Sequence, residues 1–155
     1  RRPPRATPFP YTTLFRSPLA RKSRGKAIEL DKAALAALAA AARAFAPVGG
    51  GAKGLKPVAT EVRDLFKLPL TPGELAPYDA VVLDPPRAGA QAQVRTLARS
   101  KVPVIAYVSC DAATFARDAA ILTKGGYKIG PVTPIDQFLW SSHIELVAGF
   151  TRGRA

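Results

Sequence analysis

The chain has 155 residues, 48% of them hydrophobic, which is enough to bury the core of one ordinary domain. Seven basic and no acidic residues fall in residues 1–24, so this segment carries +7 of the net charge of +12, and the remaining basic excess is compatible with RNA without being diagnostic of it. The single cysteine excludes an internal disulfide framework and a cysteine-rich metal site, so we expect no bound metal. No apolar run suits a membrane span or a signal peptide, so we expect a soluble, cytoplasmic protein.

Residues 1–17 are expected to be a non-native tail. The stretch PYTTLFRS (10–17) looks like translated adapter sequence from a sequencing library, and the Pro/Arg-rich residues before it show no periodicity. The alternative is a basic arm that contacts RNA phosphates. Native sequence is expected to begin inside an element at Pro18, so that residues 18–155 form one partial domain.

The first half of this region predicts strand, helix and strand. Residues 25–31 form a short apolar run that ends in acids, and residues 32–46 form an Ala/Leu helix with Leu35 and Leu38 on one face. After a glycine-rich connection, residues 56–66 read as a strand and its exit.

Three glycines in the connection, Gly49, Gly51 and Gly54, match the spacing G-x-G-x-x-G of dinucleotide-binding loops. That mechanism needs a strand before the glycines and a helix after them, so that phosphates meet the helix N-terminus. Here the predicted order is reversed. We therefore interpret the glycines as a flexible connection.

The second half continues the alternation. A buried strand ends at Asp84, a polar helix lies near residues 91–99, and residues 102–109 form another apolar strand. A helix follows Cys110 to about Thr123, and two final strands, which an antiparallel pairing would suit, complete the chain. The pattern predicts a doubly wound, Rossmann-like α/β fold with a mostly parallel sheet covered on both faces.

In such a fold the ligand site lies beyond the carboxyl ends of the strands. Side chains with chemical capability follow four predicted strands in turn: Glu29, Asp64, Asp84 and Cys110. Two prolines make the chain after Asp84 rigid, which suits a segment beside a bound ligand, although this acid could instead cap the next turn. Cys110 precedes a helix, where the positive end of the helix dipole favours a thiolate nucleophile, but a small buried hydrophobe is equally consistent with the pattern.

Together, DPPRAG, the cysteine of YVSCDAATFARD, GGY, PIDQF and the glutamate of HIE, in this order, resemble the C-terminal catalytic half of the S-adenosylmethionine-dependent RNA uracil-5-methyltransferases. The resemblance covers residues 18–155. It implies that Cys110 is the nucleophile and Glu145 the base, and that the substrate is a uridine of rRNA or tRNA. The acids that would contact S-adenosylmethionine are Glu29, Asp64 and Asp84.

An extruded or looped uridine needs phosphate contacts and stacking partners. The candidates are Arg87 and Arg117 for phosphates and Phe138 or Trp140 for stacking, with ordinary packing as the alternative for each. His143 is expected to position or hydrogen-bond the substrate rather than act as the base. We expect a monomer whose partner is RNA, with no membrane contact.

The chain also departs from the family pattern. Asp111-Ala112 replaces the usual Asn-Pro after the cysteine, so the added carboxylate either opposes thiolate formation or caps the helix. Phe138-Leu139 replaces the usual Phe-Pro, and the glycine-rich cofactor loop expected before Pro18 is replaced by the tail. The competing hypotheses are a cysteine hydrolase, a non-catalytic RNA-binding module and an exocyclic-amine methyltransferase with an Asp-Pro-Pro motif.

Overall fold

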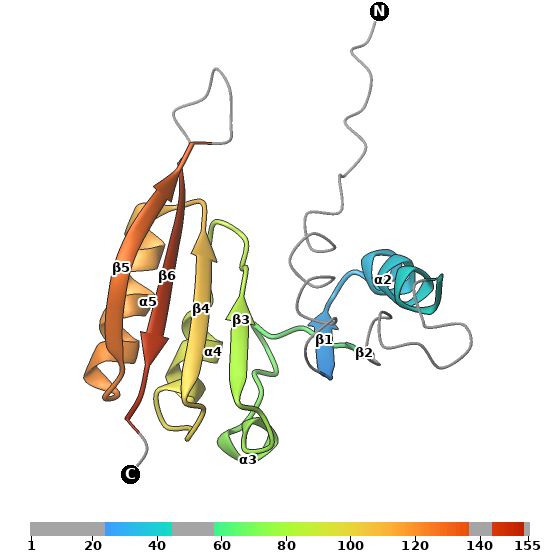
Figure 1. Cartoon of the computed structure of the whole chain (residues 1–155), viewed down its shortest axis with the longest axis horizontal. Helices are drawn as coiled ribbons and strands as arrows, with labels where there is room; N and C mark the ends of the chain where they lie inside the picture. The colour runs from blue at the N-terminus through green and yellow to red at the C-terminus, as the bar shows by residue number, and fades with distance from the viewer. Residues whose placement is uncertain (1–23, 45–57, 137–143, 154–155) are drawn as a thin grey trace, which may run out of the picture. The chain divides into compact units, whose positions relative to one another are not determined.

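The computed structural model describes residues 24–44, 58–136 and 144–153. The chain divides into two compact units, residues 1–64 and residues 65–155. Figure 1 shows the elements along the chain, with a pair of strands in the first unit and a four-stranded sheet in the second. Within the described residues, no helix combines the length and apolar character needed to cross a bilayer.

The first unit is a strand–helix–strand arrangement. Strands β1 (Gly25–Glu29) and β2 (Val58–Val62) are parallel, with Glu29 opposite Val62, and helix α2 (Lys32–Ala44) connects them in sequence. Asp31 caps this helix, since its Oδ1 accepts the N–H of Ala33 at 2.8 Å. As predicted, Leu35 and Leu38 are both buried, and they pack with a buried β1 residue, Ala27.

The second unit is a mixed sheet of strands in the order β3-β4-β6-β5. The strands are β3 (Ala80–Leu83), β4 (Val104–Ser109), β5 (Lys128–Ile135) and β6 (Glu145–Thr151). Strand β3 runs parallel to β4, and β6 lies between β4 and β5 and is antiparallel to both. The last two strands therefore pair as the sequence suggested.

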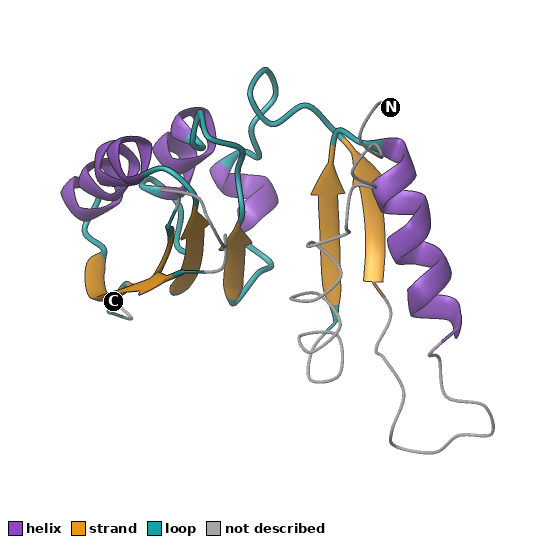
Figure 2. Ribbon diagram, turned by 90° about the horizontal axis from the view of Figure 1, so that it is seen from above, coloured by secondary structure: helices purple, strands orange, loops and turns teal. Residues whose placement is uncertain are grey.

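Three helices of the second unit lie on one face of this sheet (Figure 2). They are α3 (Pro72–Leu75), α4 (Gln91–Leu97) and α5 (Ala112–Lys124). Their apolar side chains and the inward residues of the strands form one core, which includes Leu83, Leu97, Ile105, Tyr107, Phe115, Leu122 and Phe150. Burial of this apolar surface is the main stabilising contribution to the unit.

Two sequence predictions need correction. The sheet pairings described are parallel at β1-β2 and β3-β4 but antiparallel at β4-β6 and β5-β6, so the sheet is mixed rather than mostly parallel. Strand β3 was expected to be buried, yet Val82 is 43% exposed and only Leu83 is buried. The reason is that α3, α4 and α5 all lie on one face of the sheet, so alternate residues of β3 point away from them.

Candidate active site

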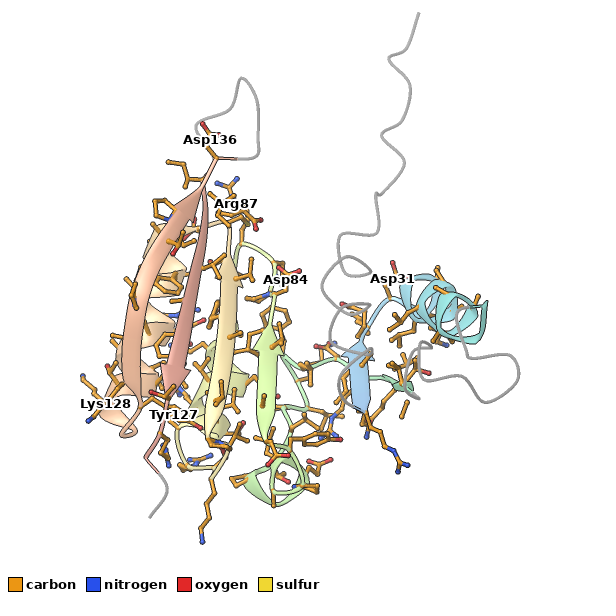
Figure 3. The ribbon with its side chains drawn as sticks, viewed as in Figure 1. Asp31, Asp84, Arg87, Tyr127, Lys128 and Asp136 are labelled. Atoms are coloured by element: carbon orange, nitrogen blue, oxygen red, sulfur yellow. The ribbon has the colours of Figure 1, made fainter. Side chains whose placement is uncertain are left out.

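The carboxyl ends of β3 and β4 place two predicted site residues side by side. These strands are parallel, with Leu83 opposite Tyr107, and Asp84 and Cys110 follow where the strands end. Figure 3 shows Asp84 and Arg87 at this end of the sheet, and Tyr127 at the opposite end. Asp84 is exposed and Cys110 is half-buried, so solvent and ligands can reach this end of the sheet.

Strand β6 brings Glu145 to the same end. In the antiparallel pairing of β4 and β6, the last residues opposite each other are Ser109 and Leu146. Cys110 and Glu145 each lie one position beyond this pair, so extending the register sets them opposite each other. Glu145 is half-buried and is itself opposite Ile135 of β5. The predicted nucleophile, which follows the last residue of β4, and the predicted base, the first residue of β6, therefore lie at the same end of neighbouring strands, although they are far apart in the sequence.

The residue after the cysteine caps helix α5. Asp111 is extended, with φ −140° and ψ 116°, and its Oδ1 accepts the backbone N–H of Thr114 at 2.9 Å. The single hydroxyl proton of Thr114 is shared between this oxygen, at 3.1 Å, and the carbonyl oxygen of Arg87, at 3.0 Å. These hydrogen bonds, helped by the charge of Arg87, hold the pKa of Asp111 below its usual value. Of the two roles considered for this carboxylate, helix capping is therefore the one for which the structure shows contacts.

Ser109, the residue before Cys110, also holds the turn that carries the cysteine. The Ser109 hydroxyl donates to the carbonyl oxygen of Asp111 at 3.1 Å and accepts the N–H of Asp111 at 3.3 Å. Ser109 is buried. Cys110 therefore lies between two residues that are held by hydrogen bonds, which fixes the main chain that carries its thiol.

The loop after Asp84 packs closely against α5. The N–H of Gly89 donates to the carbonyl of Pro86 at 2.8 Å, which closes a turn, and Gly89 has a positive φ of 75°. A Cβ at this glycine would lie 2.5 Å from Nη2 of Arg117 and 2.7 Å from Oδ2 of Asp118. Glycine is therefore required here both by backbone conformation and by the close approach of the helix.

Arg117 was predicted to contact RNA, and its guanidinium already has protein partners. Its Nε donates to Oδ1 of Asp118 at 2.9 Å, and its Nη2 donates to the carbonyl of Ala88 at 2.9 Å. Sequence reasoning missed Asp118 altogether. A helical aspartate normally faces solvent, and only the loop folded against α5 shows that this one is completely buried.

The first unit holds the other two predicted acids. Glu29 ends β1 and Asp64 follows β2, and the N–H of Arg63 donates to the carbonyl of Glu29 at 3.1 Å, so both acids lie at the carboxyl end of this parallel pair. Both are half-buried. Oε1 of Glu29 accepts the backbone N–H of Leu30 at 2.7 Å, and carboxylates at such strand ends are able to accept hydrogen bonds from ribose hydroxyls.

The structure thus gathers Asp84, Arg87, Cys110 and Glu145 at one end of the four-stranded sheet. Three further candidates, Phe138, Trp140 and His143, lie outside the described residues. In the part of the chain that is described, no cluster of three His, Cys, Asp or Glu side chains is arranged to hold a metal ion.

Similar proteins share both the sequence and the fold. The chain is 57% identical over 136 residues to an uncharacterised RNA methyltransferase of Brucella suis, covering 88% of this chain and 31% of that protein. It is 47% identical over 74 residues to the 23S rRNA (uracil(1939)-C(5))-methyltransferase RlmD of Colwellia psychrerythraea, covering 48% of this chain and 16% of that protein. The chain therefore spans about a third, or less, of the length of these relatives.

Among solved structures, the crystal structure of Pyrococcus abyssi tRNA (uracil-54, C5)-methyltransferase with S-adenosyl-L-homocysteine superposes with a TM-score of 0.65 at 29% identity. The match covers 86% of this chain and 30% of that one, and it identifies the fold as an α/β methyltransferase fold. Residues 51–151 match the profile of the tRNA (uracil-5-)-methyltransferase family, a span that includes Asp84, Cys110 and Glu145. From this match over most of its length, the chain belongs to the tRNA (uracil-5-)-methyltransferase family.

Proposed function

We propose that residues 18–155 are part of the catalytic domain of an S-adenosylmethionine-dependent RNA uracil-5-methyltransferase, and that Cys110 and Glu145 carry its chemistry. The observation on which this depends is the register of β4 and β6, which brings the cysteine and the glutamate to the same end of adjacent strands. Membership of the family supports a uridine of tRNA or rRNA as the substrate.

Cys110 is the proposed nucleophile. Carbon 5 of uracil is too weak a nucleophile to take a methyl group unaided. Addition of the Cys110 thiolate to carbon 6 forms a carbon–sulfur bond and moves the electrons of the 5,6 double bond into an enolate, so that carbon 5 becomes electron-rich. The fixed turn between Ser109 and Asp111 favours this step, because it holds the main chain of Cys110 in a defined place at the end of β4.

Glu145 is the proposed base. Once carbon 5 carries both a methyl group and its original hydrogen, a carboxylate must remove that hydrogen as a proton. The electron pair of the broken carbon–hydrogen bond then restores the 5,6 double bond and expels the sulfur of Cys110 as a thiolate. The same residue pair is thereby returned to its starting state, except that Glu145 must pass its proton to solvent.

The residues that would hold the cofactor are Glu29 and Asp64, through ribose and base hydrogen bonds, and Asp84 at the end of β3. S-adenosylmethionine supplies, when bound, the methyl group that carbon 5 receives. Arg87, which is exposed beside Asp84, is the arginine we propose for contact with an RNA phosphate. Phe138, Trp140 and His143 are proposed to stack on or position the flipped uridine.

Trapping with 5-fluorouridine tests this proposal. In 5-fluorouridine, fluorine replaces the hydrogen that Glu145 would remove from carbon 5 as a proton. The elimination of Cys110 is therefore blocked, and the carbon–sulfur bond stays intact. The full gene product that carries these residues is incubated with tRNA and rRNA transcripts containing 5-fluorouridine, with and without S-adenosylmethionine. We expect a denaturation-resistant complex that depends on the methyl donor, with the RNA mapped to Cys110, and none with Cys110→Ser.

Each competing function gives a different result. An exocyclic-amine methyltransferase would methylate RNA without forming the complex, and a non-catalytic RNA-binding module would bind RNA without methylating it. A cysteine hydrolase would form no donor-dependent complex. Absence of the complex, or its persistence in Cys110→Ser, would therefore reject the proposed mechanism.

A further inference from the structure

Asp118 is a completely buried carboxylate that joins three separate segments of the second unit. Its Oδ2 accepts the hydroxyl of Tyr107 at 2.6 Å and the backbone N–H of Ala90 at 2.7 Å. Its Oδ1 accepts the Nε–H of Arg117 at 2.9 Å and forms an ion pair with Nη2 of the same guanidinium, also at 2.9 Å. The donors come from strand β4, from the loop after Asp84 and from helix α5, so the two charges are paired and the carboxylate oxygens are both satisfied.

The loop is held to α5 at several consecutive positions. The hydroxyl of Thr114 donates to the carbonyl of Arg87 at 3.0 Å, and Nη2 of Arg117 donates to the carbonyl of Ala88 at 2.9 Å. With the bond from Ala90 to Asp118, three backbone groups of the loop are bound by one helix. Residues 114, 117 and 118 are spaced i, i+3 and i+4, which places them on one face of α5.

The helix and the loop each begin within two residues of a residue of the proposed active site. Helix α5 starts at Ala112, two residues after Cys110, and the loop starts directly after Asp84. Tyr107 lies three residues before Cys110 on the strand that presents it. These contacts therefore join the segment that carries the cysteine to the segment that carries the aspartate, at the end of the sheet where both residues lie.

The protonation states suit this arrangement. Burial, together with the adjacent Asp118 carboxylate, raises the pKa of Tyr107 well above its usual value, so the hydroxyl remains a donor throughout the range in which the protein is assayed. The Arg117 side chain is 37% exposed and the Asp118 side chain is fully buried, so water screens the ion pair while the carboxylate still bears the cost of desolvation. The net stabilisation that such a pair contributes is therefore a weak reason for its presence here, whereas fixed geometry between two site segments is a specific one.

We propose that Tyr107, Thr114, Arg117 and Asp118 are positioning residues that clamp the loop after Asp84 to the helix after Cys110 and so fix the distance between these two residues. The inference rests on the proposed function for its catalytic consequence, though the clamp itself is a statement about structure. Displacement of a reacting group by about 1 Å can cost about 100-fold in rate. The clamp gives Arg117 a role other than the RNA contact expected from the sequence.

The chain offers a matched control for the test. Arg152 forms a similar clamp with the carbonyls of Ser100, Ala98 and Gly125, and its guanidinium lies 4.3 Å from the centre of the Tyr127 ring. Tyr127 lies at the end of the sheet opposite Asp84 (Figure 3). A lysine at either arginine keeps the charge but loses the planar set of donors. Arg117→Lys and Arg152→Lys therefore remove the same kind of contact at opposite ends of the sheet.

The experiment compares Arg117→Lys, Tyr107→Phe and Arg152→Lys in the full gene product. For each variant we measure the melting temperature, the single-turnover rate of complex formation with 5-fluorouridine RNA, the RNA affinity, and amide hydrogen exchange at Gly89 and Ala90. We expect Arg117→Lys and Tyr107→Phe to slow complex formation about 100-fold, with RNA affinity unchanged and faster exchange at both amides. Arg152→Lys should lower the melting temperature but leave the rate and these two amides unchanged.

Three results would overturn the clamp. The first is wild-type exchange at Gly89 and Ala90 in both Arg117→Lys and Tyr107→Phe. The second is that Arg152→Lys slows the reaction as much as Arg117→Lys does for the same loss of melting temperature, which would show a purely structural effect. The third is weaker RNA binding by Tyr107→Phe as the sole cause of its slower reaction. If the wild-type protein forms no complex, the proposed function fails, and the exchange measurements alone then decide whether the clamp exists.

Discussion

Oδ1 of Asp111 accepts the backbone N–H of Thr114 at 2.9 Å, so the residue after the cysteine is the N-cap of α5. Replacement by alanine removes this acceptor and leaves a helix N–H without its partner. We expect Asp111→Ala to lower the melting temperature by several degrees and to loosen the turn that holds Cys110. Asp111→Asn, which keeps the acceptor oxygen but loses the charge, should lower the melting temperature less than Asp111→Ala does. Equal melting temperatures for Asp111→Ala and the wild type would contradict the capping role.

The same cap makes stability depend on pH. The pKa of Asp111 is lower in the folded protein than its usual value of about 3.9, so the folded state binds the proton less readily than the unfolded state. The contribution is fully present above the usual pKa and is lost as the pH falls through the lowered one. Melting temperatures of wild type and Asp111→Asn, measured from pH 7 down to pH 3, should converge at the acidic end. A difference that stays constant over this range would show that the charge of Asp111 does not contribute.

Alanine substitutions at Gly89 and Gly126 distinguish the cost of backbone strain from the cost of overpacking. Both have positive φ, 75° and 94°, but a Cβ at Gly126 would meet nothing within 4 Å, whereas one at Gly89 would overlap Arg117 and Asp118. We expect Gly126→Ala to cost about 1–2 kcal/mol of unfolding free energy from conformation alone. Gly89→Ala adds overpacking and should cost about 2–4 kcal/mol. Denaturant unfolding measures both, and equal losses would argue against the tight contact between loop and α5.

Much of the fold could be predicted from local pattern. Apolar runs followed by acids predicted β1 and β3, and the spacing of Leu35 and Leu38 predicted the buried face of α2. The helix predicted from Cys110 to about Thr123 corresponds to α5, which ends at Lys124. Helix α3 was missed although a signal exists. Thr71 and Glu74 form a capping box around Pro72, with the Thr71 N–H donating to Oε2 of Glu74 at 2.8 Å.

The residues of the candidate site could likewise be predicted only in part. Asp84 and Cys110 could be singled out because each follows an apolar strand, whereas Glu145, the first residue of β6, was singled out only by the resemblance to the family. The buried contacts of Tyr107 and Asp118 could not, because they depend on how the loop after Asp84 approaches α5 in three dimensions. The exposure of Val82 was also missed, since a local apolar run does not reveal which sheet face the helices cover.

The most direct test of the account uses ordinary uridine RNA and the variant Glu145→Gln. Glutamine cannot take the proton from carbon 5, so the carbon–sulfur bond formed by Cys110 should persist after methylation. In the full gene product with S-adenosylmethionine, we predict that Glu145→Gln accumulates a denaturation-resistant protein–RNA complex that carries the methyl group, whereas the wild type turns over and the double variant Cys110→Ser, Glu145→Gln forms none. Wild-type turnover by Glu145→Gln, or a covalent complex in the double variant, would contradict the assignment of these two residues.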